Sequence, residues 1–515
     1  MSPLQQFPGI RLCRAIVAPV NEGRAFFWFG LALAATLGLS HQGYDTSEGL
    51  AHLRTALFWL ETGDLGQPRR PGAIFLQAPD GLYYPAHELG NILWLLPAAA
   101  AGLAAEALAG GHAVLDGADA RRAEVVASFM SPLTVAATAL GFWKLLEWSF
   151  AVPVRVRLAA SALLVFATML LPYSRSLSDV VATGCWITWG AAFAARATAR
   201  GRAEDAALSG FFLGCAFLTR LPAGVAILPV VIAMIARATP ERRAALAAAA
   251  VAAALPSLAA VLWFNDVRTG SPFVPGLLHP QYTITQPGSG SLAAGAAGLL
   301  FSPGKSIFLF SPALLIAALG MPRMLRDART DALMVLGVLA LFVGVHGSLL
   351  SWHGDWGWGP RYAVFVLPLL LLPAVFVLNA GEATGARRHA MRGIVAAGVV
   401  VQLAAVAINW QYQYQLMSAD GRLHASTPWR ADNQLTDGLR AAAGNAARTA
   451  GAGMPARVPA GVSRHTRTAS TGVNVWWITA VRAGVLPAYA LAAAAALFAI
   501  AAFAWRRALE LSAPR

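Results

Sequence analysis

The chain has 515 residues, of which 57% are hydrophobic and 12% are charged. Soluble domains carry about 25% charged residues, so a chain of this composition cannot cover itself with polar side chains in water. The net charge of +14 would suit nucleic-acid binding in a soluble protein. Here the arginines lie between apolar segments, and those segments contain no motif that binds nucleic-acid bases or the phosphate backbone. We therefore predict an integral membrane protein with no nucleic-acid partner.

Apolar runs of about 20 residues predict an all-α fold with about twelve transmembrane helices. The N-terminus lacks a signal-peptide cleavage pattern, so the first run is expected to remain as a span. The predicted spans lie at 24–40, 121–142, 157–173, 178–197, 205–220, 222–237, 243–264, 305–320, 331–350, 361–379, 392–408 and 484–504.

The loops between these runs alternate between two kinds. One kind is short and rich in arginine, such as ARATARGR at 195–202 and ARATPERR at 236–243. The other kind is richer in aromatic, glycine, proline and acidic residues, such as PYSRSLSD at 172–179 and SWHGDWGWGPRY at 351–362. The positive-inside rule places the first kind in the cytoplasm. Abundant alanine and arginine favour a bacterial source, so we expect a multi-pass inner-membrane protein whose second kind of loop faces the periplasm.

One apolar segment breaks this alternation. Residues 89–109 are long enough to cross, but a crossing there would place Asp179 inside and the VRVR motif at 154–157 outside. We interpret this segment as a helix that lies in or dips into the outer leaflet. The first external loop then runs from 41 to 120. Within it, residues 45–62 show helical spacing and predict a second interfacial helix that stops at Gly63.

The predicted domain organisation has three parts. Residues 1–408 form the transmembrane module, 409–483 form a long external loop or small cap, and 484–515 form the last transmembrane helix with a cytoplasmic tail. Within the long loop, residues 437–472 are rich in Gly, Ala, Arg, Ser and Thr and are predicted to be flexible.

Three external carboxylates are candidates for chemistry. Asp45 and Glu48 follow the first span and stand one helical turn apart, so both can face one site. The alternative for Asp45 is a solvated loop residue. Asp179 stands at the external start of a span, where it either caps the helix or takes part in a site, with Arg175 as a nearby partner.

Three basic residues lie on the external side, against the charge rule. Arg361 is either a lipid headgroup anchor or a phosphate clamp, for which its planar five-donor fork is suited. The same alternatives apply to Arg220. Lys305 lies in FSPGKS, where the glycine spacing does not match a P-loop, so we reject nucleotide binding there.

The histidines and cysteines indicate no metal site on their own. His87 precedes Glu88, but no two histidines stand at ligand spacing on one helix. Cys13, Cys185 and Cys215 are far apart and match neither a disulfide framework nor a zinc motif. We assign no metal ligand and no cofactor, and the sequence leaves a divalent cation open.

Several short motifs follow one another in an order that resembles a known superfamily. In this order the chain resembles the GT-C glycosyltransferases, which depend on lipid carriers and include aminoarabinose, mannosyl and protein O-mannosyl transferases. The resemblance covers most of residues 20–410. The motifs are the acidic pair Asp45 and Glu48, Gly-Asp at 63–64, DGLYYPAHELG at 80–90, the pair Arg121 and Arg122, YSRSLSD, FLTRLP, FNDVRTGSP, FSPGKS and WGPRY.

The resemblance implies inverting transfer of a sugar from a polyprenyl-phosphate donor to an external glycan, lipid or protein. It implies that Asp45 is the catalytic base. The expected catalytic residues are Asp45, Glu48 and Asp179. The expected ligands of the donor phosphate are Arg361, Lys305, Arg220 and Arg121. The expected substrate-binding residues are Tyr84, His87, Glu88, His353 and Tyr362.

The main alternative is a transporter or flippase of envelope glycolipids. Such a protein needs paired charges near the bilayer midplane and internal pseudo-symmetry. The predicted spans are instead apolar at their centres, and the two halves of the chain do not match. A third alternative is a non-catalytic partner in the assembly of envelope polysaccharide.

Overall fold

The computed structural model describes most of the chain in eleven stretches. Asp45 lies in the gap between the first two stretches, and only the backbone of Arg121 is described. The described residues are 19–43, 48–69, 74–108, 121–279, 288–354, 357–380, 385–410, 413, 427–450, 473–478 and 487–513.

The described residues form helices almost throughout, which confirms the predicted all-α class. The one sheet among them pairs β1 (Phe75–Gln77) antiparallel with β2 (Tyr83–Pro85). Short 3-10 turns occur at η2 (Leu221–Ala223), η3 (Gly276–Leu278), η4 (Arg361–Val366) and η5 (Thr427–Trp429). The helices are α1 (Pro19–Ser40), α2 (Gly49–Thr62), α3 (Leu89–Leu108), α4 (Arg121–Ser128), α5 (Met130–Ser149), α6 (Val154–Phe166), α7 (Leu170–Tyr173), α8 (Asp179–Arg200), α9 (Ala203–Thr219), α10 (Gly224–Arg237), α11 (Pro240–Thr269), α12 (Leu292–Phe301), α13 (Ile307–Phe310), α14 (Ala313–Asp327), α15 (Arg329–Gly347), α16 (Leu367–Leu371), α17 (Ala374–Leu378), α18 (Gly385–Ala407), α20 (Gln434–Thr449) and α23 (Pro487–Ser512).

Every predicted span contains helix. By length and composition, seven described helices could cross a membrane, and one of the seven is α3. Shorter apolar helices occupy further spans, among them Leu221–Arg237 and Arg361–Leu371. The chain is therefore a multi-pass membrane protein in which several spans are divided into shorter helices.

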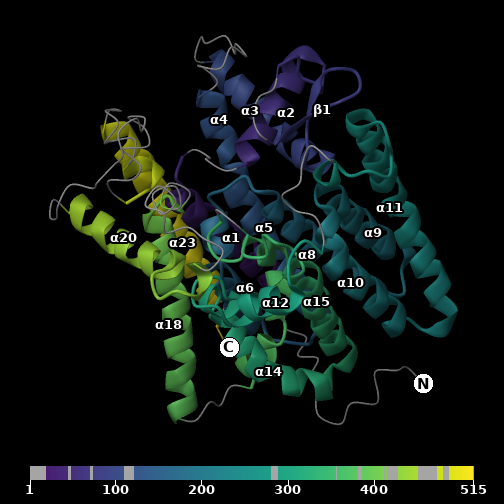
Figure 1. Ribbon diagram of the computed structural model, residues 1–515. Helices are drawn as coiled ribbons and strands as arrows, with labels where there is room; N and C mark the ends of the chain where they lie inside the picture. Colours follow the sequence, from purple (N-terminus) through teal and green to yellow (C-terminus); the bar gives the residue numbers. More distant parts are fainter. Residues whose placement is uncertain are drawn as a thin grey trace.

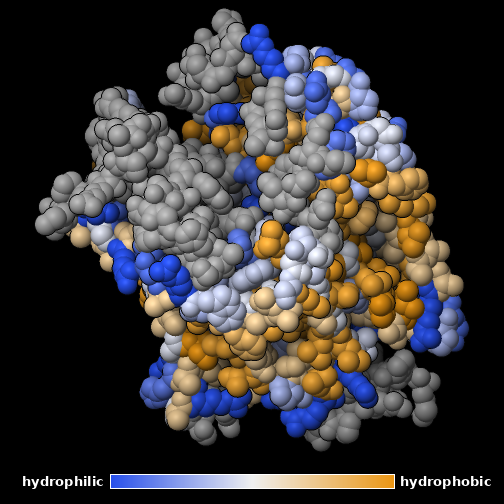
Figure 2. All heavy atoms as spheres, in the orientation of Figure 1, coloured by the Kyte–Doolittle hydropathy of each residue, from blue (hydrophilic) through white to orange (hydrophobic). Residues whose placement is uncertain are grey.

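The long helices pack side by side in a bundle (Figure 1). Helix α1 lies along α23, so the two ends of the described chain pair with each other. Helix α8 lies between α5 and α9, and α9 packs in turn on α11. The visible face carries apolar side chains over the middle of the bundle and hydrophilic ones at its lower end (Figure 2). This distribution suits a bundle whose middle lies in lipid.

The helices of the first external loop pack together at the upper end of the molecule in Figure 1. Helix α3 packs mainly on α2 and α4. The predicted stop of α2 is confirmed, because Gly63 adopts the left-handed conformation with φ of 78° and its N–H bonds to Trp59 O. The placement of α3 at the membrane surface stays a prediction, since its length alone allows a crossing.

Helix α20 corrects the expectation of a flexible segment. Residues 437–449 were predicted to be flexible, but they belong to α20, which begins with a capping box. The Asn433 side chain accepts hydrogen bonds from Leu435 N and Thr436 N, and Thr436 Oγ1 accepts one from Asn433 N. Alanine makes up much of the helix and favours this conformation. The rest of the predicted flexible segment, 451–472, lies outside the described residues.

Candidate active site

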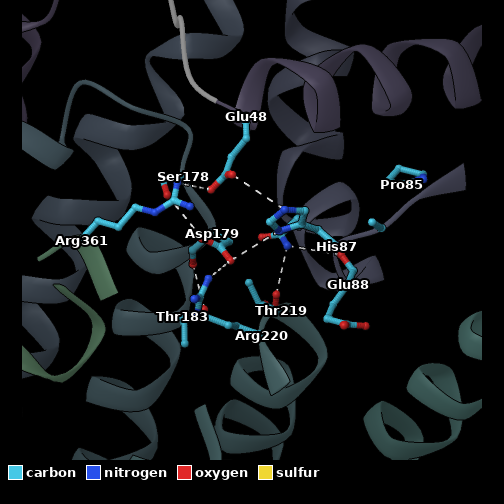
Figure 3. A network of polar contacts seen from close by, with 12 residues as sticks. Glu48, Pro85, His87, Glu88, Ser178, Asp179, Thr183, Thr219, Arg220 and Arg361 are labelled. Carbon is cyan, nitrogen blue, oxygen red and sulfur yellow. Dashed lines mark hydrogen bonds and ion pairs between the residues drawn. The ribbon is translucent and has the colours of Figure 1, made fainter. Parts of the chain in front are cut away.

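Polar side chains from five separate segments meet at neighbouring helix ends (Figure 3). Each residue stands at the start or end of a helix, on the side of the chain predicted to be external. We call this set the polar cluster; its members are Glu48 before α2, His87 before α3, Asp179 at the start of α8, Arg220 after α9 and Arg361 at the start of η4.

Glu48 and Arg361 form the more accessible ion pair of the polar cluster. Arg361 Nη1 donates to Glu48 Oε1 over 2.9 Å, and the two side chains remain 21% and 17% exposed. Burial raises the pKa of Glu48, but the charges of Arg361 and His87 outweigh this effect and hold the pKa below its ordinary value. Glu48 is therefore ionised at neutral pH, and the side chain of Arg361 remains partly exposed.

Asp179 and Arg220 form the more buried pair. Arg220 Nη1 donates to Asp179 Oδ2, and the Asp179 side chain is 2% exposed. The carboxylate also stands in the first turn of α8, where the helix dipole favours negative charge. Arg175, the partner expected for Asp179, directs Nη1 at the carbonyls of Ala405 and Val406, at 2.9 and 2.6 Å. Arg220 thus neutralises the negative charge of Asp179.

Tyr362 connects the two ion pairs. The Cζ atom of Arg220 lies 4.9 Å from the centroid of its ring, and that of Arg361 lies 5.2 Å away. Guanidinium groups at these distances are attracted by the aromatic face. The buried ring of Tyr362 therefore contacts both guanidinium groups of the polar cluster.

His87 lies between the two carboxylates. Its Nε2 is 3.8 Å from Glu48 Oε2, and its Nδ1 is 3.9 Å from Asp179 Oδ2. These distances exceed those of direct hydrogen bonds, so the contacts are electrostatic. The His52 ring lies edge-on at 5.0 Å from His87. Burial lowers the pKa of His52 to about 3, so this second ring is neutral at pH 7 and adds no positive charge.

A close approach of two backbones brings the start of α2 against the segment that precedes α8. A Cβ atom added to Gly49 would lie 2.1 Å from Leu177 O, so only glycine permits this contact at the start of α2. Gly49 follows Glu48 directly, and Leu177 stands two residues before Asp179. This packing therefore sets the spacing between the two carboxylates of the polar cluster.

Lys305 lies beneath the loop that leads to Arg361. Its Nζ donates to Gly357 O over 2.9 Å and to Gly359 O over 3.0 Å, and the side chain is buried. The expected role of Lys305 as a direct phosphate ligand stays a prediction. The contacts that the structure assigns to its ammonium group support the loop itself.

Glu88 forms a buried ion pair with Arg268 of α11. Arg268 Nη2 donates to Glu88 Oε2 over 2.6 Å, and Arg268 Nη1 donates to His87 O over the same distance. The same Nη1 also bonds to Ala86 O at 2.9 Å. Arg268 is fully buried. The pair therefore shapes the segment that carries His87, although the sequence suggested a substrate-binding role for Glu88.

Replacing Glu88 by alanine is expected to lower the free energy of unfolding by about 3–5 kcal/mol, because the Arg268 charge would remain buried without its carboxylate. Thermal unfolding in lipid nanodiscs, followed by tryptophan fluorescence, measures the change. Glu61→Ala, at an exposed position of α2, is the control and should leave stability unchanged. If the Glu88→Ala variant is as stable as wild type, the structural role is wrong and a substrate-binding role for Glu88 is favoured.

Of the other expected site residues, Tyr84 and His353 make the contacts given below, and Asp45 and the side chain of Arg121 lie outside the described residues. Tyr84 OH donates to Asp80 Oδ2 over 2.9 Å, and burial and this bond raise the pKa of Tyr84 to about 12. His353 packs against Trp352, with ring centroids 5.5 Å apart. Neither of these contacts involves the polar cluster.

In the part of the chain that the structure describes, no three His, Cys, Asp or Glu side chains are grouped so that they could hold a metal ion. Both carboxylates of the polar cluster are paired with guanidinium groups instead. Each guanidinium group of the polar cluster therefore has a carboxylate as its partner.

Comparisons with known proteins give weak structural likenesses. No family model matches the chain, and no curated protein matches it significantly. ArnT from Cupriavidus metallidurans bound to undecaprenyl phosphate is 14% identical over 90% of this chain and 78% of its own, with a TM-score of 0.46. The apo state of the same protein is 14% identical over 96% of this chain and 75% of its own, with a TM-score of 0.45. The archaeal oligosaccharyltransferase AglB from Archaeoglobus fulgidus, in complex with an inhibitory peptide and a dolichol-phosphate, is 13% identical over 75% of this chain, with a TM-score of 0.43. The matched part of this chain spans 56% of the length of AglB.

Proposed function

We propose that the chain is an inverting glycosyltransferase that moves a sugar from a polyprenyl-phosphate carrier to an external acceptor. The acceptor is a hydroxyl or amine of a glycan, a lipid or a protein. The proposed location is a bacterial inner membrane, with the polar cluster facing the periplasm. The arginine-rich loops on the opposite side support this orientation.

The observation that carries the proposal is the placement of two guanidinium groups at the ends of apolar helices, on the side that the sequence predicts to be external. Arg361 and Arg220 share the Tyr362 ring, and Arg361 is partly exposed. Guanidinium groups bind phosphate through paired, charge-assisted hydrogen bonds. The phosphate of a lipid carrier lies at the membrane surface while its chain stays in the bilayer. A site at this depth therefore suits a lipid-linked phosphate.

In the proposed reaction Asp45 accepts the proton of the acceptor group as that group attacks the anomeric carbon of the sugar. A new bond forms between the acceptor and the sugar, and the bond between the sugar and the phosphate oxygen breaks. This single displacement inverts the configuration. The leaving polyprenyl phosphate gains negative charge, which Arg361 and Arg220 stabilise. Arg121 stays a further candidate for the same role.

The remaining polar residues support this chemistry in the proposal. Asp179 holds Arg220, Glu48 holds Arg361 until the donor arrives, and His87 lies between the two carboxylates. Glu48 and Asp179 are also candidates to orient the acceptor. The donor phosphate competes with Glu48 for Arg361, so donor binding releases a carboxylate beside the reacting groups.

The alternative of a transporter or flippase has less support. Transport sites use paired charges near the bilayer midplane, lined by broken helices in matching positions of two repeats. The ion pairs of the polar cluster instead stand at helix ends on one side. An interfacial enzyme accounts for this one-sided placement more directly.

The test is in vitro transfer by the purified chain in nanodiscs, with a panel of polyprenyl-phosphate sugars and mixed glycan, lipid and peptide acceptors. We expect mass spectrometry to find one glycosylated product together with free polyprenyl phosphate. Nucleotide sugars are the control donors and should give no product. Flipping of a labelled glycolipid in proteoliposomes, without transfer from any donor, would overturn the proposal in favour of the transporter.

A further inference from the structure

The loop that precedes Arg361 is held by one side-chain amide from the long external loop. Gln434 Nε2 donates to Gly357 O over 2.9 Å, and Gln434 Oε1 accepts from Gly359 N over 3.0 Å. Gln434 is the first residue of α20 and is 5% exposed. One amide thus satisfies a carbonyl and an N–H of the same short loop, as a partner strand would.

Lys305 fixes the same loop through its carbonyls. Its Nζ contacts Gly357 O and Gly359 O, so Gly357 O accepts from both Lys305 and Gln434. Backbone polar groups of a buried loop must find partners, and here two side chains distant in sequence provide them. The conformation of residues 357–359 therefore depends on tertiary contacts rather than on the local sequence.

This loop forms the surface on which the Arg361 side chain lies. A Cβ atom added to Gly357 would lie 2.6 Å from Arg361 Cβ, 2.9 Å from Arg361 Cδ and 2.5 Å from Tyr173 OH. Tyr173 OH also donates to Trp358 O over 3.2 Å. The aliphatic stem of Arg361 is thus in direct contact with the loop, and a displaced loop would move the guanidinium group.

Helix α20 is itself anchored away from this loop. Asn445 Nδ2 donates to Ala407 O at the end of α18, over 3.1 Å. Gly304 N donates to Pro428 O over 2.8 Å, which joins the segment before α20 to the turn that carries Lys305. Gln434, the first residue of α20, is therefore held by the Gly304–Pro428 bond near it, whereas the Asn445 bond holds the opposite end of the helix.

We propose that Gln434 is a positioning residue for Arg361. Gln434 acts through the backbone of Gly357–Gly359 and so orients the guanidinium group of Arg361 toward the phosphate of a lipid ligand. The identity of that ligand rests on the proposed function. The long external loop accordingly contributes to the site, although it supplies none of the residues of the polar cluster. The sequence offered no signal for this role, because Gln434 lies beyond all the motifs that resemble the superfamily.

The test compares Gln434→Leu with Asn445→Leu in the full chain in nanodiscs. Each variant removes one buried amide that bonds to backbone from the same helix, so Asn445→Leu is the matched control. We expect Gln434→Leu to weaken the affinity for undecaprenyl phosphate about tenfold and to speed deuterium exchange at the Gly359 amide. Asn445→Leu should leave the affinity within twofold of wild type. Gln434→Glu keeps the acceptor for Gly359 N but repels Gly357 O. Its affinity for undecaprenyl phosphate should lie between those of Gln434→Leu and Asn445→Leu.

The Arg361→Ala background distinguishes positioning from general destabilisation. If Gln434 acts through Arg361, then Gln434→Leu should cause no further loss of affinity in that background. An additional tenfold loss there, or an equal loss in Asn445→Leu, would overturn the inference. If Arg361→Ala alone binds undecaprenyl phosphate as wild type does, the proposed donor site fails instead, and the inference fails with it.

Discussion

Asp45→Asn is expected to reduce sugar transfer about 10²- to 10⁴-fold and to leave the amount of folded protein unchanged. The substitution keeps the size of the side chain and removes the group that would accept the proton of the acceptor, and general-base catalysis contributes a factor of this order. Single-turnover transfer from the donor identified by the panel measures the loss. The affinity for the donor should stay close to that of wild type.

The described residues on both sides of Asp45 are held by specific contacts. Gly43 N donates to His41 Nδ1 over 2.9 Å, and Trp476 N donates to His41 O over 2.8 Å. On the other side, Glu48 is held by Arg361. The described residues that flank Asp45 are therefore tied to Trp476 on one side and to Arg361 on the other.

The matched control for Asp45→Asn is Asp266→Asn, the same change at an exposed position near the C-terminal end of α11. It should transfer sugar at the wild-type rate. If Asp45→Asn keeps wild-type turnover, Asp45 is not the base. Glu48→Asn and Asp179→Asn in the same assay would then identify which of the two remaining carboxylates takes that role.

Much of the fold followed from local patterns in the sequence. Apolar length predicted the helices, and the Gly63 signal predicted the end of α2. Charge alternation placed Glu48, Asp179 and Arg361 on one side, and the structure brings all three into one cluster. Each of these predictions depended on residues close together in the chain or on the positive-inside rule, which treats each loop separately.

The pairing of charges could not be predicted in this way. The sequence offered Arg175 as the partner of Asp179 because the two are near neighbours, whereas the structure pairs Asp179 with Arg220, 41 positions away. The Glu88–Arg268 pair joins positions 180 apart. Such contacts depend on how helices pack, and helical periodicity in one segment carries no information about its partner.

The β1–β2 hairpin was missed although a signal was present. Asp80 and Gly81 stand between FLQ at 75–77 and YYP at 83–85, and Gly81 adopts a φ of 84°. An Asp-Gly pair between β-favouring residues is a strong local indicator of a hairpin. The resemblance to the superfamily marked Tyr84 of this stretch as a substrate-binding residue, and its hydroxyl group donates to Asp80 within the hairpin.

Arg361→Ala is expected to lower kcat/KM for the donor by about 10² to 10³, because a fixed donor of charge-assisted hydrogen bonds to the leaving phosphate is lost. Arg361→Lys should recover only part of this activity. A lysine keeps the charge but lacks the planar fork that binds two phosphate oxygens, and it cannot contact the Tyr362 ring as a guanidinium does. Steady-state transfer with varied donor concentration measures both changes.

Two further variants separate phosphate binding from other effects of Arg361→Ala. Arg440→Ala removes an exposed arginine of α20 that pairs with Asp432, and it should leave transfer unchanged. Glu48→Gln frees Arg361 from its carboxylate. If Glu48 only holds Arg361, this variant should bind polyprenyl phosphate at least as tightly as wild type, since the phosphate no longer competes with a carboxylate. Weaker binding in Glu48→Gln would mean that the ion pair, rather than Arg361 alone, forms the phosphate site.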